Sequence, residues 1–196
     1  GWLIIAIIVI AVIAYYWPRL TTPSKSQKAD LSMLPETFIV FDFETTGLKA
    51  ESHEIIEFGA IKVNRDEIEH TSFQSLIKPK KKIPKKITEI TGITQEMVDQ
   101  HGAAIEDILP QFIEFIGDHH LVAYNIEFDL AFLRASMAKI GIERKLSNPT
   151  SCALQMARRA WPGRRSYKLI DVAKDGGLPT EDSHRSIGDC KRTLLV

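Results

Sequence analysis

A short apolar run that ends in two carboxylates is the feature that most constrains the fold of this chain. Residues 38–41 are all hydrophobic, which is typical of a strand buried on both faces of a sheet. Asp42 and Glu44 follow, and residues two apart on a strand point to the same face, about 6.6 Å apart. Two like charges at the end of a buried strand are unfavourable without a positive charge between them. The pattern therefore predicts a buried strand that ends at a divalent cation site.

Two further acidic segments occur later in the chain. Asn125 leads into a stretch with apolar residues at helical spacing, and Asp129 borders its apolar face. The third segment runs from His184 to Asp189, with Ser183 as the expected N-cap of the last helix. At the start of that helix, His184 would lie at the positive end of the helix dipole, which favours the neutral imidazole that a general base needs. Carboxylates with one histidine and no cysteine cluster favour Mg²⁺ or Mn²⁺ over zinc.

The periodicity of the remaining chain predicts a mixed α/β sheet with helices packed on it. Strands are expected over residues 38–41, 54–64, 67–77 and 121–124. Helices are expected over residues 94–100, 105–116, 127–140, 151–160, 169–175 and 183–196. The lysine-rich stretch between the third strand and the first helix is expected to be a loop.

The three acidic segments, in this order, resemble those of the DEDDh 3′-to-5′ exonucleases, and most closely those of the proofreading epsilon subunits of bacterial DNA polymerase III. The segments read Asp-x-Glu-Thr-Thr-Gly, Asn-x-x-x-Asp and His-x-x-x-x-Asp, and Thr91-Gly92-Ile93 is similar to a spacer of that family. The resemblance covers residues 37–196 and implies a ribonuclease H-like fold with two divalent cations, Mg²⁺ or Mn²⁺. It further implies hydrolysis of phosphodiester bonds from single-stranded or frayed 3′ ends of nucleic acid, with DNA favoured, and release of nucleoside monophosphates.

The resemblance also implies a role for each motif residue. Asp42 would bridge both cations, while the other carboxylates, Glu44, Asp129 and Asp189, would complete the two metal sites. His184 would take the proton from the attacking water. The terminal nucleotide would contact Thr45, Thr46, Gly47, Asn125 and Phe128.

Two other functions stay open at this point. An RNA-directed 3′ exonuclease, like ribonuclease T or oligoribonuclease, uses the same chemistry, and tolerance of the 2′-hydroxyl is not written in these motifs. A non-catalytic, membrane-tethered nucleic-acid-binding module would account for the basic residues but leaves the four carboxylates unexplained. A polymerase partner is likewise left undecided.

The formal net charge is zero, so attraction to nucleic acid has to come from local clusters of charge. One cluster holds six lysines within nine residues: Lys78, Lys80, Lys81, Lys82, Lys85 and Lys86. A second surrounds Trp161 and Pro162 and holds five cations: Arg158, Arg159, Arg164, Arg165 and Lys168. Both are candidate phosphate contacts, although a single lysine run is more often a solvated loop.

The N-terminus has a different composition. Residues 2–17 carry no charge, and as a helix they would rise about 24 Å, a little less than the roughly 30 Å hydrocarbon core. Aromatic residues of the kind found at membrane interfaces lie at both ends of the run: Trp2, Tyr15, Tyr16 and Trp17. Basic residues flank the run on its C-terminal side only. A cleaved signal peptide is the alternative, but no basic residue precedes the run. These features predict a transmembrane anchor at 1–17, a polar linker at 18–36 and an exonuclease domain at 37–196. The expected location is the bacterial inner membrane, with the catalytic domain on the cytoplasmic side.

Overall fold

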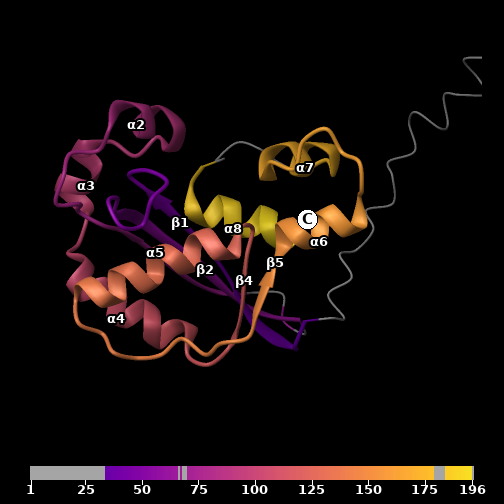
Figure 1. Ribbon diagram of the computed structural model, residues 1–196, viewed down its shortest axis with the longest axis horizontal. Helices are drawn as coiled ribbons and strands as arrows, with labels where there is room; N and C mark the ends of the chain where they lie inside the picture. The colour runs from indigo at the N-terminus through magenta and orange to yellow at the C-terminus, as the bar shows by residue number, and fades with distance from the viewer. Residues whose placement is uncertain (1–33, 66, 68–69, 179–183, 196) are drawn as a thin grey trace, which may run out of the picture. The chain divides into compact units, whose positions relative to one another are not determined.

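Five strands form one mixed sheet in the order β3-β2-β1-β4-β5 (Figure 1). The computed structural model describes residues 34–65, 67, 70–178 and 184–195. The first three strands pair with one another in antiparallel fashion: β1 (Thr37–Thr45), β2 (Ile55–Asn64) and β3 (Thr71–Leu76). On the other side of β1, two strands are added in parallel: β4 (His120–Ala123) and β5 (Thr150–Cys152). The predicted mixed α/β sheet is confirmed.

Seven helices are described between and after the strands. Three lie between β3 and β4: α2 (Lys85–Thr91), α3 (Gln95–His101) and α4 (Ile105–Ile116). The others are α5 (Ile126–Lys139), α6 (Ala153–Ala160), α7 (Leu169–Asp175) and α8 (Ser186–Leu195).

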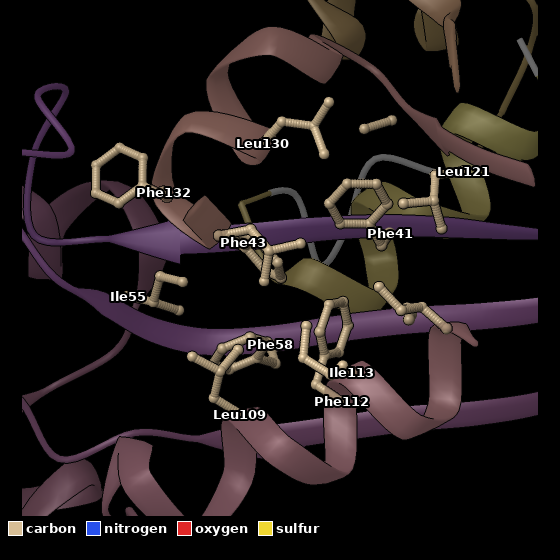
Figure 2. Close-up of a cluster of buried hydrophobic side chains, with 14 of the residues drawn as sticks. Phe41, Phe43, Ile55, Phe58, Leu109, Phe112, Ile113, Leu121, Leu130 and Phe132 are labelled. Atoms are coloured by element: carbon tan, nitrogen blue, oxygen red, sulfur yellow. The ribbon is translucent and has the colours of Figure 1, made fainter. Parts of the chain in front are cut away.

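The main core lies on the face of the sheet that α4 and α5 cover. Phe41 and Phe43 of β1 point to this face, as expected from the two-residue period of a strand. Their rings pack against Phe58 of β2 and Phe112 of α4, with ring centroids 4.8–6.1 Å apart (Figure 2). Leu130 of α5 closes the same cluster.

The even-numbered residues of β1 point to the opposite face, which α8 covers. Phe38 and Val40 are buried there beside Cys190 of α8. Leu34, within the stretch predicted as a linker, is 5% exposed and belongs to the same cluster. Asp42 and Glu44 continue the even-numbered series, so the strand delivers both carboxylates to the α8 side.

Gly59 permits α8 to begin close to the sheet. It lies opposite Asp42 in the β1–β2 register. A Cβ atom added at Gly59 would lie 2.4 Å from Ser186 Oγ and 2.7 Å from the Ser186 carbonyl carbon. A side chain at this position would therefore displace the first turn of α8.

Three predicted elements differ from the structure for local reasons. The predicted lysine loop ends early, because Pro84, with a ψ of 139°, is the extended residue that precedes a helix, and α2 begins at Lys85. Strand β5 occupies residues where a helix was predicted, since three residues are too few to show a two-residue period. Helix α8 begins at Ser186, because His184 has a φ of +61° that an α-helix cannot accommodate. The expected N-cap, Ser183, lies outside the described residues.

The predicted location in a bacterial inner membrane is corrected. Over the part of the chain that the structure describes, no helix is long and apolar enough to span a membrane. The longest of these, α5, has 14 residues and would rise about 21 Å, short of a roughly 30 Å hydrocarbon core. The apolar run within residues 1–17, on which the predicted anchor rested, lies outside the described residues.

The contact between Gly59 and α8 gives a first prediction. Gly59→Ala should lower the free energy of unfolding by about 2 kcal/mol, because the new methyl group overpacks a filled interface. Urea denaturation followed by circular dichroism measures the change. Gly176→Ala is the matched control, since its Cβ would have only ordinary contacts, the closest at 3.5 Å. Equal effects of the two substitutions would contradict this role for Gly59.

Candidate active site

Three carboxylates from two distant parts of the chain meet at the end of β1. Asp42, Glu44 and Asp189 each offer a carboxylate oxygen, and these oxygens lie within 4.8 Å of one another. Asp42 and Glu44 come from one face of β1, and Asp189 comes from the first turn of α8. The sequence prediction that Asp42 and Glu44 share a face is confirmed. Asp42 and Asp189 are partly exposed, so a ligand can reach them.

Asp129 approaches the same site from α5. The pairing of β1 with β4 ends at Val40, so the β1 backbone beyond it is available to other partners. The backbone N–H of Phe43 donates a hydrogen bond to Asp129 Oδ1 at 3.2 Å. Asp129 is 3% exposed, and its negative charge raises the pKa of Asp42. The fourth predicted carboxylate thus lies beside the other three.

Burial and mutual repulsion disfavour the charged forms of these carboxylates. Burial, followed by the charges of Asp129, Glu44 and Asp189, raises the pKa of Asp42 well above its usual value. Burial raises the pKa of Glu44 to about 8, with a further contribution from Asp189. Burial also raises the pKa of Asp129 to about 8, against the lowering effect of the Phe43 hydrogen bond. A bound cation would remove this penalty, because it favours the ionised carboxylates.

Two basic side chains of its own segment lie near Asp189. Arg192, one helical turn later, lies 3.1 Å from Asp189 Oδ1. Burial raises the pKa of Asp189, whereas Arg192 and His184 lower it. His184 therefore lies near Asp189, and its side chain is exposed at the edge of the site. The left-handed backbone at His184 turns the chain into α8 at this point.

Glu57 fixes the start of α8 to strand β2. It lies opposite Glu44 in the strand register and is fully buried. Its carboxylate accepts hydrogen bonds from the Arg185 guanidinium at 2.7 Å and from the Ser186 backbone N–H at 3.0 Å. Burial would raise the pKa of Glu57, but the Arg185 and Ser186 hydrogen bonds outweigh it and hold the pKa below its usual value. Glu57 is thus ionised, and it holds Arg185, the residue after His184, against β2.

The turn after β1 is held by hydrogen bonds of its own. Thr46 and Glu54 bond twice, from Thr46 N to Glu54 O at 2.8 Å and from Glu54 N to Thr46 Oγ1 at 3.0 Å. Thr45 Oγ1 donates to Gly47 O at 2.7 Å. A Cβ atom at Gly47 would lie 2.5 Å from the His53 ring, so a larger residue there would displace that ring. The predicted nucleotide-binding turn is therefore rigid beside Glu44.

The remaining predicted contact residues lie at the start of α5. Asn125 is exposed, and its side chain makes no capping hydrogen bond. Phe128 is half-buried and packs on Phe132 with ring centroids 5.0 Å apart. Both residues are within four positions of Asp129, so they lie at the same helix end as that carboxylate.

The arrangement can hold a hard divalent cation. Oxygen ligands of Mg²⁺ lie at about 2.1 Å, so ligand oxygens on opposite sides of the ion are about 4.2 Å apart. The separations among Asp42, Glu44 and Asp189 are of this order. The acidic donor set and the raised pKa values both fit such an ion.

The residues that support the site were not singled out in the sequence. Glu57 could have been found as the one charged residue within the apolar run 55–61 of β2. Gly59 gave no such signal, because a glycine in a strand has several explanations. Arg192 could also have been found, because it follows Asp189 by three residues, a spacing at which side chains on one helix meet.

The raised carboxylate pKa values predict an unusual dependence of stability on pH. In the folded, metal-free protein Glu44 and Asp129 hold protons up to about pH 8, whereas the unfolded chain releases them near pH 4. The folded state therefore binds more protons in this window, and its stability falls as the pH rises from about 5 to 8. The lowered pKa of Glu57 acts only below this range.

Thermal melting in the presence of a chelator, at several pH values from about 5 to 9, measures this effect. Excess Mn²⁺ should raise the melting temperature most at the highest pH values, because the ion replaces the protons that the carboxylates have lost. The combined Glu44→Gln, Asp129→Asn variant should show a flatter profile. A chelated wild-type protein that becomes more stable with rising pH would contradict the burial of these carboxylates.

The Glu57–Arg185 pair gives a separate prediction. Glu57→Gln should lower the free energy of unfolding by roughly 3 kcal/mol, because it breaks a buried ion pair. A double-mutant cycle with Arg185→Met isolates the pair, and urea denaturation of the four proteins should give a coupling above about 1 kcal/mol. Additive effects of the two substitutions would show that the pair does not anchor α8.

Comparison with known proteins agrees with this geometry. Residues 39–196 match the Exonuclease (RNase_T) family. The DNA polymerase III subunit epsilon of Aquifex aeolicus is 36% identical over 172 residues, which cover 88% of this chain and 84% of that protein. The DNA polymerase III PolC-type of Clostridium perfringens is 40% identical over 161 residues, 82% of this chain. The match spans only 11% of that much longer protein.

Solved structures share the fold. The complex of E. coli exonuclease I with single-stranded DNA aligns with a TM-score of 0.72 at 19% identity, over 81% of this chain and 39% of that one. Exonuclease X in complex with 5′ overhanging duplex DNA aligns with a TM-score of 0.63 at 26% identity, over 81% and 87% of the two chains. The sheet and its helices are thus a ribonuclease H-like exonuclease fold. The family match and the epsilon relative show that this chain belongs to the Exonuclease (RNase_T) family.

Proposed function

We propose that the chain is a metal-dependent 3′-to-5′ exonuclease of the DEDDh type that acts on DNA and releases nucleoside monophosphates. The observation that carries the proposal is the convergence of four acidic side chains from β1, α5 and α8, three of them with oxygens within 4.8 Å. Such a cluster of like charges is unfavourable in a folded protein unless cations occupy it. Membership of the exonuclease family gives the cluster its reaction class.

Two divalent cations, Mg²⁺ or Mn²⁺, fit this donor set. They would supply charge neutralisation at the phosphate and a more acidic water, which is the chemistry that phosphodiester hydrolysis needs. Asp42, at the centre of the cluster, would serve both ions. Glu44 and Asp189 would complete one position, and Asp129 would support the other.

The other residues would orient the substrate and move a proton. His184, exposed beside Asp189, would accept the proton of the attacking water. The rigid turn over Thr45, Thr46 and Gly47 would contact the terminal nucleotide. The exposed Asn125 and the half-buried Phe128 would line its pocket from the start of α5.

DNA is the preferred substrate class. Exonuclease X, the structural relative at 26% identity, is bound to 5′ overhanging duplex DNA, and the epsilon relative belongs to a DNA polymerase. Digestion of 3′-labelled and 5′-labelled oligonucleotides of DNA and RNA, with Mg²⁺ or Mn²⁺, tests the substrate and the direction together. Release of labelled mononucleotide first from the 3′-labelled DNA supports the proposal. Equal or faster digestion of RNA would favour an RNA-directed enzyme, and no digestion would contradict catalysis.

Removal of Asp42 should have the largest effect on activity. Asp42→Asn should lower kcat by at least about 10³-fold, because the central ligand of both ions is lost. Single-turnover digestion of a single-stranded oligonucleotide measures the rate, and excess chelator should abolish it in the wild type. Glu51→Gln, an exposed acid of the loop between β1 and β2, is the control. Activity of the wild type in excess chelator would contradict the metal requirement.

His184 should affect the rate without affecting metal binding. His184→Ala should lower kcat by roughly 10²-fold to 10⁴-fold, the usual contribution of a general base. Calorimetric titration with Mn²⁺ should give an affinity near that of the wild type, whereas Asp189→Ala should bind weakly. An equal loss of metal affinity in both variants would show that His184 is a ligand instead of a base.

A further inference from the structure

A basic and aromatic surface lies beside the predicted substrate pocket and has no role in the proposed chemistry. It is formed by residues 158–168, from the end of α6 to the start of α7, and we call it the basic-aromatic segment. The segment contains five cations and no acidic residue. Trp161 is 38% exposed, one of the few large apolar side chains that are solvent-accessible in the described part of the chain.

The segment is rigidly connected to the start of α5. The Tyr124 hydroxyl, adjacent to Asn125, donates a hydrogen bond to the Tyr167 carbonyl. The Tyr167 hydroxyl in turn donates to the Trp161 carbonyl at 2.6 Å and accepts from Arg164 N at 3.2 Å. Burial raises the pKa of Tyr124 to about 12, so this tyrosine remains a donor at neutral pH. The backbone of Trp161 is therefore held in a fixed relation to the predicted nucleotide pocket.

The cations of the segment divide into two groups. Arg164 is structural, because its guanidinium binds Asp175 at 2.6 Å and the Ser166 carbonyl at 3.2 Å. Arg158 lies over the Tyr167 ring at 5.8 Å. The other three are exposed and have no carboxylate partner among the residues that the structure describes: Arg159, Arg165 and Lys168.

The lysine cluster differs in this respect. Three of its lysines lie within 4.0 Å of acidic groups: Lys78 beside Asp99, Lys80 beside Glu106 and Lys85 beside Glu89. Its charge is therefore partly compensated within the protein. It also has no exposed aromatic ring, so it lacks the second element of a single-strand binding surface.

We propose that the basic-aromatic segment is a binding subsite for single-stranded nucleic acid upstream of the 3′-terminal nucleotide. Trp161 stacks on a base, and Arg159, Arg165 and Lys168 contact phosphates. This combination of an aromatic face with unpaired cations binds a single strand without reading its sequence. The inference rests on the proposed function, because that function places the strand's 3′ end at Asp42 and its upstream nucleotides outside the pocket.

Binding of a 5′-fluorescein-labelled dT12 to the full chain, measured by anisotropy in excess chelator, tests the subsite without any cleavage. The Arg159→Ala, Arg165→Ala, Lys168→Ala triple variant should reduce the slope of log Kd against log salt concentration by about 2, because three phosphate contacts are lost. Trp161→Ala should raise Kd roughly tenfold, and Trp161→Phe should restore most of the affinity.

A triple substitution in the lysine cluster, Lys81→Ala, Lys82→Ala, Lys86→Ala, is the charge-matched control. It should change the salt slope less than the triple variant of the basic-aromatic segment. An equal change, or an unchanged Kd in Trp161→Ala, would overturn the inference, because attraction would then depend on net charge alone.

Hydrolysis of the 4-nitrophenyl ester of thymidine 5′-monophosphate separates this inference from the proposed function. The ester fills only the terminal pocket, so the two triple variants and both Trp161 variants should hydrolyse it at the wild-type rate. A loss of ester hydrolysis in Trp161→Ala would overturn the subsite, since the substitution would then disturb the pocket itself. A wild type that binds dT12 through this segment but hydrolyses neither substrate would contradict the proposed function and leave the subsite supported.

Discussion

The contact of α8 with strand β2 is the constraint on which the candidate site depends. Gly59 lets the helix begin against the sheet, and Glu57 binds the backbone of its first residue. Both residues lie opposite the acidic end of β1 in the strand register. Because the two strands and the helix are fixed together in this way, Asp189 reaches the carboxylates of a strand that lies more than 140 positions earlier in the chain.

The acidic cluster has an electrostatic cost that the surrounding structure only partly offsets. Asp189 is near Arg192, Asp129 accepts a hydrogen bond from the Phe43 backbone, and Glu57 accepts hydrogen bonds from Arg185 and Ser186. Asp42 has no hydrogen bond or ion pair of this kind among the described residues, and its pKa is raised well above the usual value. Asp129 and Asp189, at the edge of the cluster, therefore have partners within the protein, whereas Asp42 at its centre has none in the part of the chain that the structure describes. A cation site requires such an uncompensated carboxylate.

Sequence periodicity predicted the parts of the site that depend on local geometry. Asp42 and Glu44 were placed on one face by the two-residue period of a strand, and Asp129 was placed at the edge of an apolar helical face. The supporting residues could not be predicted in the same way, because Glu57 and Gly59 act through contacts with a helix 127 or more positions away. The start of α8 was wrong by three residues, since a left-handed residue such as His184 has no signature in composition. Strand β5 was missed because its pairing with β4, and not its own three residues, makes it a strand.

Proton release on metal binding shows directly whether the buried carboxylates are protonated in the metal-free protein. If Glu44 and Asp129 are protonated in the metal-free protein, Mn²⁺ has to displace those protons when it binds at about pH 7. Titration calorimetry in two buffers of different ionisation enthalpy measures the number released. We expect at least about one proton to be released per protein molecule, and fewer in the Glu44→Gln, Asp129→Asn variant. Metal binding with the same heat in both buffers, or no binding at all, would contradict a buried, self-repelling carboxylate site.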